Sequence, residues 1–409
     1  MTDSDPLAGL DDLAGLDDVP CAQLPHSYGT AEDVPGRLRA IRAGVREGSY
    51  PPMAQLADRI VHQGTRSQAA AHTVPVLVRM ALDPTLVNRR RFVGLLVAIA
   101  IGVDDNHLPN GYDPREDRAH LEGPRGEADV RARWIAEAAD DEQRAQREGG
   151  RAQVLVDAEA VVRCHSAVRE ALPVLDVLLS SDSAELRAET ANLIAWFPES
   201  AAATVPLLQA FVADEVSPGA AATGLVLGLL GEPAAVPFVE RHLDSPVVEL
   251  RRASAFASTR LGIAGPAVVD VLTGVVAGPP EKTGTIPSGS YRGLAAMAWP
   301  KRPKAQRSQR VDAMLTGLAG CTGVEAFYDR YYTAQTLFTL VFRPVEPPHS
   351  VDDLSDVDDP SDVQQRVVRF LAGRDEDGWP SGARDALRRW KVPTEGSDLP
   401  VRGIVRAGR

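Results

Sequence analysis

A proline followed by apolar residues at offsets of one, two, five and six occurs five times along the chain. The five prolines are Pro75, Pro173, Pro206, Pro237 and Pro266. Nineteen of the twenty positions that they define are apolar, and the exception is a histidine. The last four prolines are 33, 31 and 29 residues apart. A period near thirty residues predicts stacked supersecondary units, each of which buries its apolar face against its neighbours.

The segments before the later prolines carry a helical pattern. The tripeptide Glu-Leu-Arg occurs at 185–187 and again at 249–251, 64 residues or two periods of 32 further on, and apolar or small residues follow at the spacing of one helix face. Proline is tolerated in the first turn of a helix, where its missing N–H is not needed. We therefore expect each repeat to be a helix, a tight turn and a second helix that begins near its proline.

The stretch before Pro75 is expected to hold the same kind of helix pair. The pattern predicts a helix over Met53–Gln63 with Gly64 as its C-cap. Thr65 and Gln68 then have the spacing of a capping box, which leads toward the helix that carries Pro75.

Interruptions of the pattern divide the chain into nine segments. Helical repeats are expected at 36–103, 151–278 and 311–345, with a C-terminal helical cap at 363–392. A charged insert at 104–150, a Gly/Pro/Lys-rich loop at 279–310 and an acidic linker at 346–362 separate them. An acidic, largely disordered segment at 1–35 and a tail at 393–409 form the two ends. The insert is expected to replace or decorate repeats rather than to start an unrelated domain.

Residues 7–18 are two identical copies of Leu-Ala-Gly-Leu-Asp-Asp. With six aspartates and no lysine or arginine between Asp3 and Asp18, this stretch repels itself and has little apolar surface to bury. A disordered tail is the favoured interpretation. The alternative is a short docking peptide that uses Leu7, Leu10, Leu13 and Leu16.

Three motifs resemble those of HEAT repeats: A-L-P-V-L at 171–175, T-V-P-L-L at 204–208 and A-V-P-F-V at 235–239. The preceding helices carry E-L-R-x-x-x-A, and the short period is similar to that of the HEAT-like repeats first noted in phycobilisome lyases. The stretch from His62 to Leu77 also resembles the opening of bacterial HEAT-repeat proteins common in actinobacteria. The resemblance covers about 36–102 and 152–345. It implies an all-α, right-handed α-solenoid of HEAT-like helix pairs that binds other proteins on its concave surface.

Composition and charge narrow the choice of partner. The 409 residues include 56 Asp and Glu against 44 Lys and Arg, which gives a formal net charge of −12. Binding of nucleic acid needs a clustered positive field, so this balance argues against a nucleic-acid partner. Electrostatic complementarity favours a basic protein instead.

The thiols and the apolar runs predict a cytoplasmic protein. Cys21, Cys164 and Cys321 are far apart and form no CxxC motif, which is typical of free thiols in a reducing compartment. The N-terminus is acidic and lacks the pattern of a secretion signal. The longest apolar run, Phe92–Val103, has twelve residues. A membrane span needs roughly twenty, so no membrane association is expected.

The sequence gives little indication of a catalytic or metal-binding site. His62 and His72 have no carboxylate or thiol beside them at the spacing of a metal site, so capping or packing is the favoured role. Cys164 and His165 are adjacent, and adjacent side chains on a helix diverge, so a thiolate–imidazole pair is not expected. His107 in the insert gives no stronger signal. No nucleotide-binding or nucleophile-elbow motif is present, and neither a cofactor nor catalysis is expected.

Two dense basic runs are the strongest local charge features. They are Arg89-Arg90-Arg91 and a second group of Lys301, Arg302, Lys304, Arg307 and Arg310. A solvated face is the favoured interpretation of both. The alternative is a docking surface for an acidic partner or for nucleic acid.

Surface positions of the second helices are the expected contact residues for a partner. They are Arg79, Asp176, Gln209, Glu240, Arg241, His242 and Asp270. Their mixed to acidic character again favours a basic partner. His242 has two interpretations, a histidine at the edge of the core that bonds a carbonyl or a recognition residue that faces the groove.

The sequence thus predicts a non-catalytic scaffold or regulator that acts as a monomer and binds another protein through the concave face of a HEAT-repeat solenoid. The alternative is a HEAT-fold enzyme that acts on nucleic acid, as a glycosylase does, or attaches a cofactor, as a lyase does. Salt-sensitive binding of DNA through the basic runs would separate the second hypothesis from the first.

Overall fold

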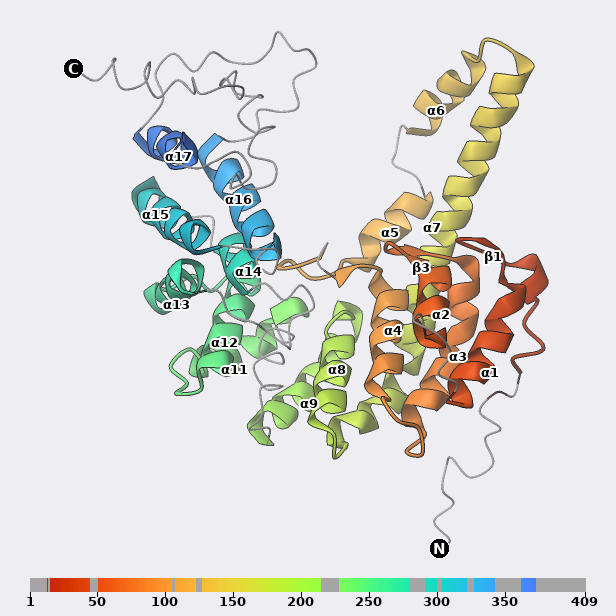
Figure 1. Ribbon diagram of the computed structural model, residues 1–409, viewed down its shortest axis with the longest axis horizontal. Helices are drawn as coiled ribbons and strands as arrows, with labels where there is room; N and C mark the ends of the chain where they lie inside the picture. Colours follow the sequence, from red (N-terminus) through yellow and green to blue (C-terminus); the bar gives the residue numbers. More distant parts are fainter. Residues whose placement is uncertain are drawn as a thin grey trace, which may run out of the picture. The chain divides into compact units, whose positions relative to one another are not determined.

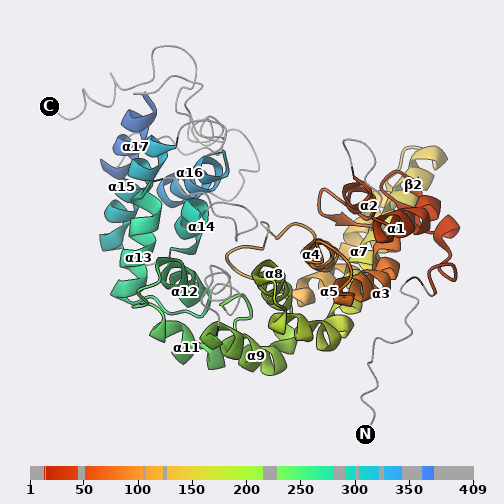
Figure 2. The same ribbon diagram turned by 60° about the horizontal axis from the view of Figure 1, so that its bottom comes forward.

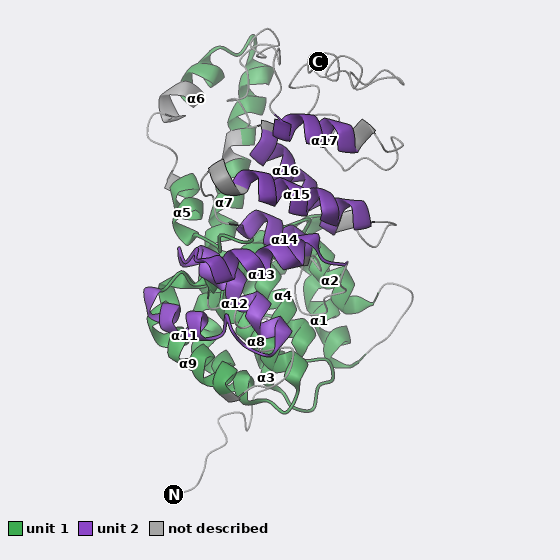
Figure 3. Ribbon diagram, turned by 90° about the vertical axis from the view of Figure 1, so that its left-hand side faces the viewer, with its two compact units in different colours: residues 1–232 green, residues 233–409 purple. Residues whose placement is uncertain are grey.

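The computed structural model divides the chain into two compact units, Met1–Glu232 and Pro233–Arg409 (Figure 3). It describes residues 13, 15–44, 51–104, 107–122, 127–214, 228–279, 291–299, 304–321, 327–342 and 362–372. Over these residues the chain is mostly helical, with two short antiparallel hairpins as its strands. The predicted all-α class is thereby confirmed for the described chain. The right-handed solenoid stays a prediction.

Unit 1 begins with two hairpins and four helices. Its elements are η1 (Cys21–Gln23), β1 (Pro25–His26), β2 (Gly29–Thr30), η2 (Ala31–Asp33), α1 (Val34–Arg42), α2 (Pro52–Ile60), β3 (Val61–His62), β4 (Thr65–Arg66), α3 (Gln68–Leu82) and α4 (Arg90–Ile101) (Figure 1). The expectation of a largely disordered segment at 1–35 is wrong for residues 15–35. Leu16, Cys21, Ala31 and Val34 are all buried there and give this stretch an apolar anchorage. Residues 1–12 lie outside the described chain.

The β3–β4 hairpin begins before the helix predicted at Met53–Gln63 was expected to end. α2 ends at Ile60, and Gln63 and Gly64 have φ of 50° and 87°. Positive φ at both central residues is what a two-residue hairpin turn requires, so Gly64 serves a turn and not a helix cap. The turn packs on the end of α4, because a Cβ at Gly102 would lie 2.6 Å from the Gly64 carbonyl oxygen. Ser67, and not Thr65, precedes the first turn of α3.

The rest of unit 1 is built around one long helix. The elements are α5 (Pro114–Glu122), α6 (Glu127–Ala136), α7 (Asp141–Leu175), η4 (Asp176–Ser180), α8 (Ala184–Ile194), η5 (Pro198–Ser200) and α9 (Ala201–Asp214). α3, α4 and α5 all pack on α7, and α6 lies beside its N-terminal half (Figure 1). The predicted boundary between insert and repeats at 150/151 is therefore wrong, since it falls inside α7.

Unit 2 is a succession of helices. They are η6 (Pro233–Ala235), α11 (Val236–Arg241), α12 (Val248–Arg260), α13 (Pro266–Ala277), α14 (Tyr291–Ala298), α15 (Lys304–Gly320), α16 (Phe327–Phe342) and α17 (Asp362–Ala372) (Figure 2). From α11 to α17 the helices pack on others one or two places away in this order. Such neighbour-to-neighbour packing is the rule in helical repeat proteins. The loop predicted at 279–310 is wrong in part, because α14 and the start of α15 occupy it, and α17 begins at the end of the linker predicted at 346–362.

The recurrent prolines do not all open a helix. Pro237 and Pro266 lie in the first turn of α11 and α13, as predicted. Pro75, Pro173 and Pro206 lie inside α3, α7 and α9, where the prediction is wrong. Each of these three helices has buried residues on both sides of its proline, and this tertiary burial outweighs the loss of one backbone hydrogen bond. None of the helices in the described part of the chain combines the length and the apolar character that a membrane crossing requires.

Candidate functional site

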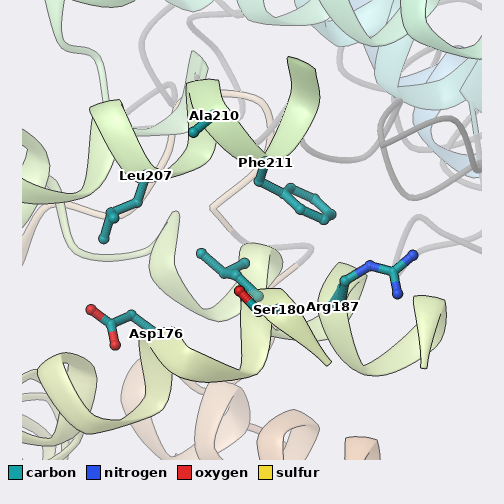
Figure 4. A pocket seen from close by; sticks show the side chains of 7 residues that line it. Asp176, Ser180, Arg187, Leu207, Ala210 and Phe211 are labelled. Carbon is teal, nitrogen blue, oxygen red and sulfur yellow. The ribbon is translucent and has the colours of Figure 1, made fainter. Parts of the chain in front are cut away.

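A groove of about 390 Å³ lies between η4, α8 and α9 in unit 1 (Figure 4). We call it the Asp176 groove, and its lining residues are Asp176, Leu179, Ser180, Arg187, Leu207, Ala210 and Phe211. The α9 residues form one apolar wall, while the acidic and basic side chains stand at opposite ends (Figure 4). A volume of this size is within the range of small-ligand and side-chain pockets in proteins.

Local bonds at the start of α8 shape the floor of the groove. Ser183 is the N-cap of this helix, and its hydroxyl accepts a hydrogen bond from the Leu186 amide at 3.2 Å. Arg187 donates to the Ser181 carbonyl at 2.6 Å, which ties the loop after η4 to the helix. The Asp176 carboxylate, in contrast, has no hydrogen bond or ion pair within the residues that the structure describes. It is therefore available to a positively charged ligand.

The first apolar position after a repeat proline is partly a surface position in this region. Val174 is 51% exposed and Leu207 is 40% exposed, whereas the next residues, Leu175 and Leu208, are fully buried. The helix continues through the proline in both repeats, so consecutive residues face different directions. The second residue after each of these prolines therefore packs in the core. In α9 the first residue after the proline, Leu207, lines the groove.

The predicted contact residues are distributed over both units. In unit 1, Asp176 lines the groove, Gln209 lies on α9 outside the lining, and Arg79 lies in the last turn of α3. In unit 2 the remaining predicted residues are Glu240 and Arg241 at the end of α11, His242 just after it, and Asp270 on α13. Of the whole set, the structure brings only Asp176 into the described groove. A role of the others in binding stays a prediction.

His242 follows the first of its two interpretations. Its Nδ1–H donates to the Phe238 carbonyl at 2.8 Å, and the two rings are 4.6 Å apart. The Arg241 guanidinium lies 5.4 Å from the centre of the Phe238 ring. His242 is therefore a half-buried residue at a position that is apolar in the other repeats. Its ring donates a hydrogen bond to a backbone carbonyl group near the end of α11.

A second constellation, which the sequence did not reveal, joins the insert to the helices. We call it the Arg66 network, and its members are Arg66, His107, Tyr112, Asp117, His165 and Glu199. Arg66 is 8% exposed and donates to the Ala100 carbonyl at 2.7 Å. Its Nη2 is 3.8 Å from Asp117 Oδ2, and the Tyr112 hydroxyl donates to the same carboxylate.

The other half of the Arg66 network lies on α7 and η5. His165 is 2% exposed, and its Nε2–H donates to Glu199 Oε1 at 2.8 Å. The ring centres of His165 and Tyr112 are 4.7 Å apart, which connects the two halves. Arg169 adds a second positive group 3.8 Å from Glu199. No sequence motif signals this set, because its members come from five separate elements or loops.

Burial controls the protonation of these groups. Burial raises the pKa of Tyr112 well above its ordinary value and lowers the pKa of His107, so both groups are held neutral. Burial alone would raise the pKa of Glu199, but the His165 hydrogen bond, a backbone amide and the Arg169 charge bring it below its usual range. Cys164 is fully buried, and burial raises the pKa of its thiol to about 12.

The chemistry available to these buried groups is limited. The Cys164 sulfur is directed to the Ser67 carbonyl, 3.9 Å away, while His165 is directed to Glu199, so the adjacent side chains diverge as predicted. A protonated, buried thiol is a poor nucleophile. His62 bonds the Asp58 carboxylate at 2.9 Å, and no group of three metal-ligating side chains occurs among the residues that can be described.

Part of each basic run is internal. Arg89 donates to the Ala81 and Leu82 carbonyls at the end of α3. Arg307 donates to the Leu340 and Val341 carbonyls of α16, and Arg310 is 5% exposed. The solvated-face interpretation is wrong for these three arginines, since their guanidinium groups satisfy helix-end carbonyls or lie in the core. Arg90 and Arg91 are exposed, and the side chains of Lys301, Arg302 and Lys304 lie outside the described set.

Comparison of the chain with models of protein families, with curated proteins and with solved structures found no match in any of the three. Function is therefore inferred from the geometry and chemistry of the Asp176 groove.

Proposed function

We propose that this chain is a non-catalytic, protein-binding scaffold of HEAT-like repeats, and that the Asp176 groove holds an apolar side chain of its partner. One observation carries the proposal, namely an apolar wall on α9 next to a carboxylate that has no partner among the described residues. A pocket of this kind recognises an apolar anchor and fixes its orientation with a few polar groups.

The charge of the groove favours a partner segment with a basic residue beside its anchor. Asp176 stands at one end of the groove and has no ion-pair partner in the part of the chain that the structure describes, and the full sequence has a net charge of −12. An arginine or lysine of the partner would pair with Asp176 while an aliphatic or aromatic neighbour contacts Leu207 and Phe211. Arg187 is engaged with Ser181, which leaves the positive end of the groove less available to a ligand.

The alternative of a HEAT-fold enzyme acting on nucleic acid has weaker support. It needs clustered and accessible basic side chains. Arg89, Arg307 and Arg310 are instead bound to carbonyls of their own chain or buried. The cofactor-attaching alternative has no described group of suitable reactivity in its favour, because the Cys164 thiol is buried and protonated.

The proposal is tested by selecting peptides from a random display library against the full-length chain. We expect the selected peptides to share an apolar residue next to arginine or lysine. Leu207→Asp and Asp176→Lys should each lower the affinity of a selected peptide about tenfold or more, as loss of an anchor contact does. Affinity is measured by fluorescence polarisation at two salt concentrations.

Matched controls carry the same chemical changes at exposed positions outside the groove. Val87→Asp introduces a charge at a side chain that is 71% exposed, and Asp244→Lys reverses an exposed charge in unit 2. Both should bind within about twofold of the wild type. Selected peptides without a shared pattern, or groove variants that bind as well as the controls, would contradict the proposed site.

A further inference from the structure

The second copy of the tandem hexapeptide, residues 13–18, is attached to unit 1 by its last leucine. Leu16 is 2% exposed, while Asp17 beside it is solvent-accessible. The Leu16 amide donates to the Leu13 carbonyl at 3.1 Å, and the Asp18 amide donates to the Gly15 carbonyl at 3.3 Å. Gly15 has φ of 78°, a conformation that favours glycine. These two hydrogen bonds close tight turns, and Leu16 is the leucine that is directed inward.

An ion pair locates this copy on the first helix of the unit. The Asp17 carboxylate is 2.5 Å from the Arg39 guanidinium of α1. Leu38, next to Arg39, is fully buried, and so is Val34 one turn earlier. The buried Leu16 is thus one residue away from an ion pair with α1, and we call the place that it occupies the site beside α1. An aspartate directly after a leucine fits such a site by charge and by spacing.

The first copy, residues 7–12, has the same six residues in the same order. Leu10 and Asp11 correspond to Leu16 and Asp17, and Gly9 corresponds to Gly15. A site that recognises the inward leucine, the turn glycine and the aspartate has no chemical means to reject the first copy. The two copies differ in their flanking residues and in their distance from the next anchored residue.

We propose that the site beside α1 binds either copy of Leu-Ala-Gly-Leu-Asp-Asp, so that residues 7–12 exchange with residues 13–18 within one molecule. Leu16 precedes the buried Cys21 by five residues, and Leu10 precedes it by eleven. The probability of loop closure falls as about the three-halves power of length, which favours the second copy about three-fold. The tandem repeat is then a self-docking segment with two registers, and the site is rarely empty.

Disulfide trapping in the full chain measures the occupancy of each register. Arg39→Cys is combined with Asp17→Cys, with Asp11→Cys, or with Asp5→Cys, which lies outside the repeat. After mild oxidation, mass spectrometry of proteolytic fragments identifies the linked pairs and separates links within a chain from links between chains. We expect the 11–39 link at about a third of the yield of the 17–39 link, and the 5–39 link below a tenth of it, because only the repeat positions bring a cysteine to α1.

Leucine variants distinguish docking from random collision. Leu10→Ala should remove the 11–39 link, and Leu16→Ala should raise it about four-fold, from about a quarter of the molecules to nearly all, since the competing copy loses its anchor. Neither substitution changes a cysteine, so a link formed by random collision would not respond to them. Equal yields for 5–39 and 11–39, no response to Leu10→Ala, or an 11–39 link found only between chains would overturn the proposal.

Discussion

Replacing Arg66 with leucine is expected to lower the free energy of unfolding of unit 1 by about 3 to 5 kcal/mol, as removal of one partner of a buried charge pair does. The variant would leave the Asp117 carboxylate without its positive neighbour at 3.8 Å. It would also leave the Ala100 carbonyl without its donor at 2.7 Å. Ala100 is buried and Asp117 is half-buried, so water cannot fully replace the guanidinium as their partner. Urea unfolding followed by tryptophan fluorescence measures the loss.

The control for Arg66 is an exposed ion pair in the insert at 104–150, between Arg115 and Asp113. Arg115 is 2.8 Å from Asp113, but its side chain is 85% exposed. Arg115→Leu should change the unfolding free energy by less than about 1 kcal/mol, because exposed ion pairs are screened by water. If Arg66→Leu were no more harmful than Arg115→Leu, the Arg66 network would not hold the insert to the helices as we infer.

Replacing Gly317 with alanine is expected to lower the stability of unit 2 by about 3 kcal/mol, at the upper end of the usual cost of overpacking. Gly317 lies on α15, and a Cβ there would be 2.1 Å from the Val276 carbonyl oxygen of α13. It would also be 3.1 Å from the Arg292 side chain, which is itself buried. The backbone carbonyl cannot move without shifting α13, so the two helices must separate.

Gly274 on the partner helix provides the matched control for Gly317. A Cβ at Gly274 meets no atom within 4 Å, and the residue is exposed in the interior of α13. Gly274→Ala should therefore stabilise the protein by about 0.5 to 1 kcal/mol through helix propensity. Chemical unfolding of both variants gives the comparison. Equal stability of the two would show that α13 and α15 do not approach each other as closely as described.

The sequence predicted the helices well because their signal is local. The period of the apolar positions predicted the second helix of each repeat. Asp176, which was predicted as a surface position of the helix that carries Pro173, does line the groove. The same period misplaced the starts of the helices that contain Pro75, Pro173 and Pro206. Burial of the preceding turns, which depends on neighbouring helices, decides where those helices begin.

The Arg66 network could not be predicted, because its contacts join residues far apart in the chain. Arg66 bonds a carbonyl 34 residues away and a tyrosine 46 residues away. Its own segment carried the pattern of a helix cap, and the two positive φ values at Gln63 and Gly64 that turn it into a hairpin leave only a weak trace in sequence. The exposure of Leu207 could not be predicted for a similar reason, since it depends on how α9 continues through Pro206.

The central claim is that the Asp176 groove binds a segment of a partner protein. Hydrogen exchange of the full chain, with and without a saturating selected peptide, tests it most directly. We expect slower exchange over 176–187 and 203–214, with this protection lost in Leu207→Asp and kept in Val87→Asp. Protection confined to other segments, or protection that survives Leu207→Asp, would contradict it.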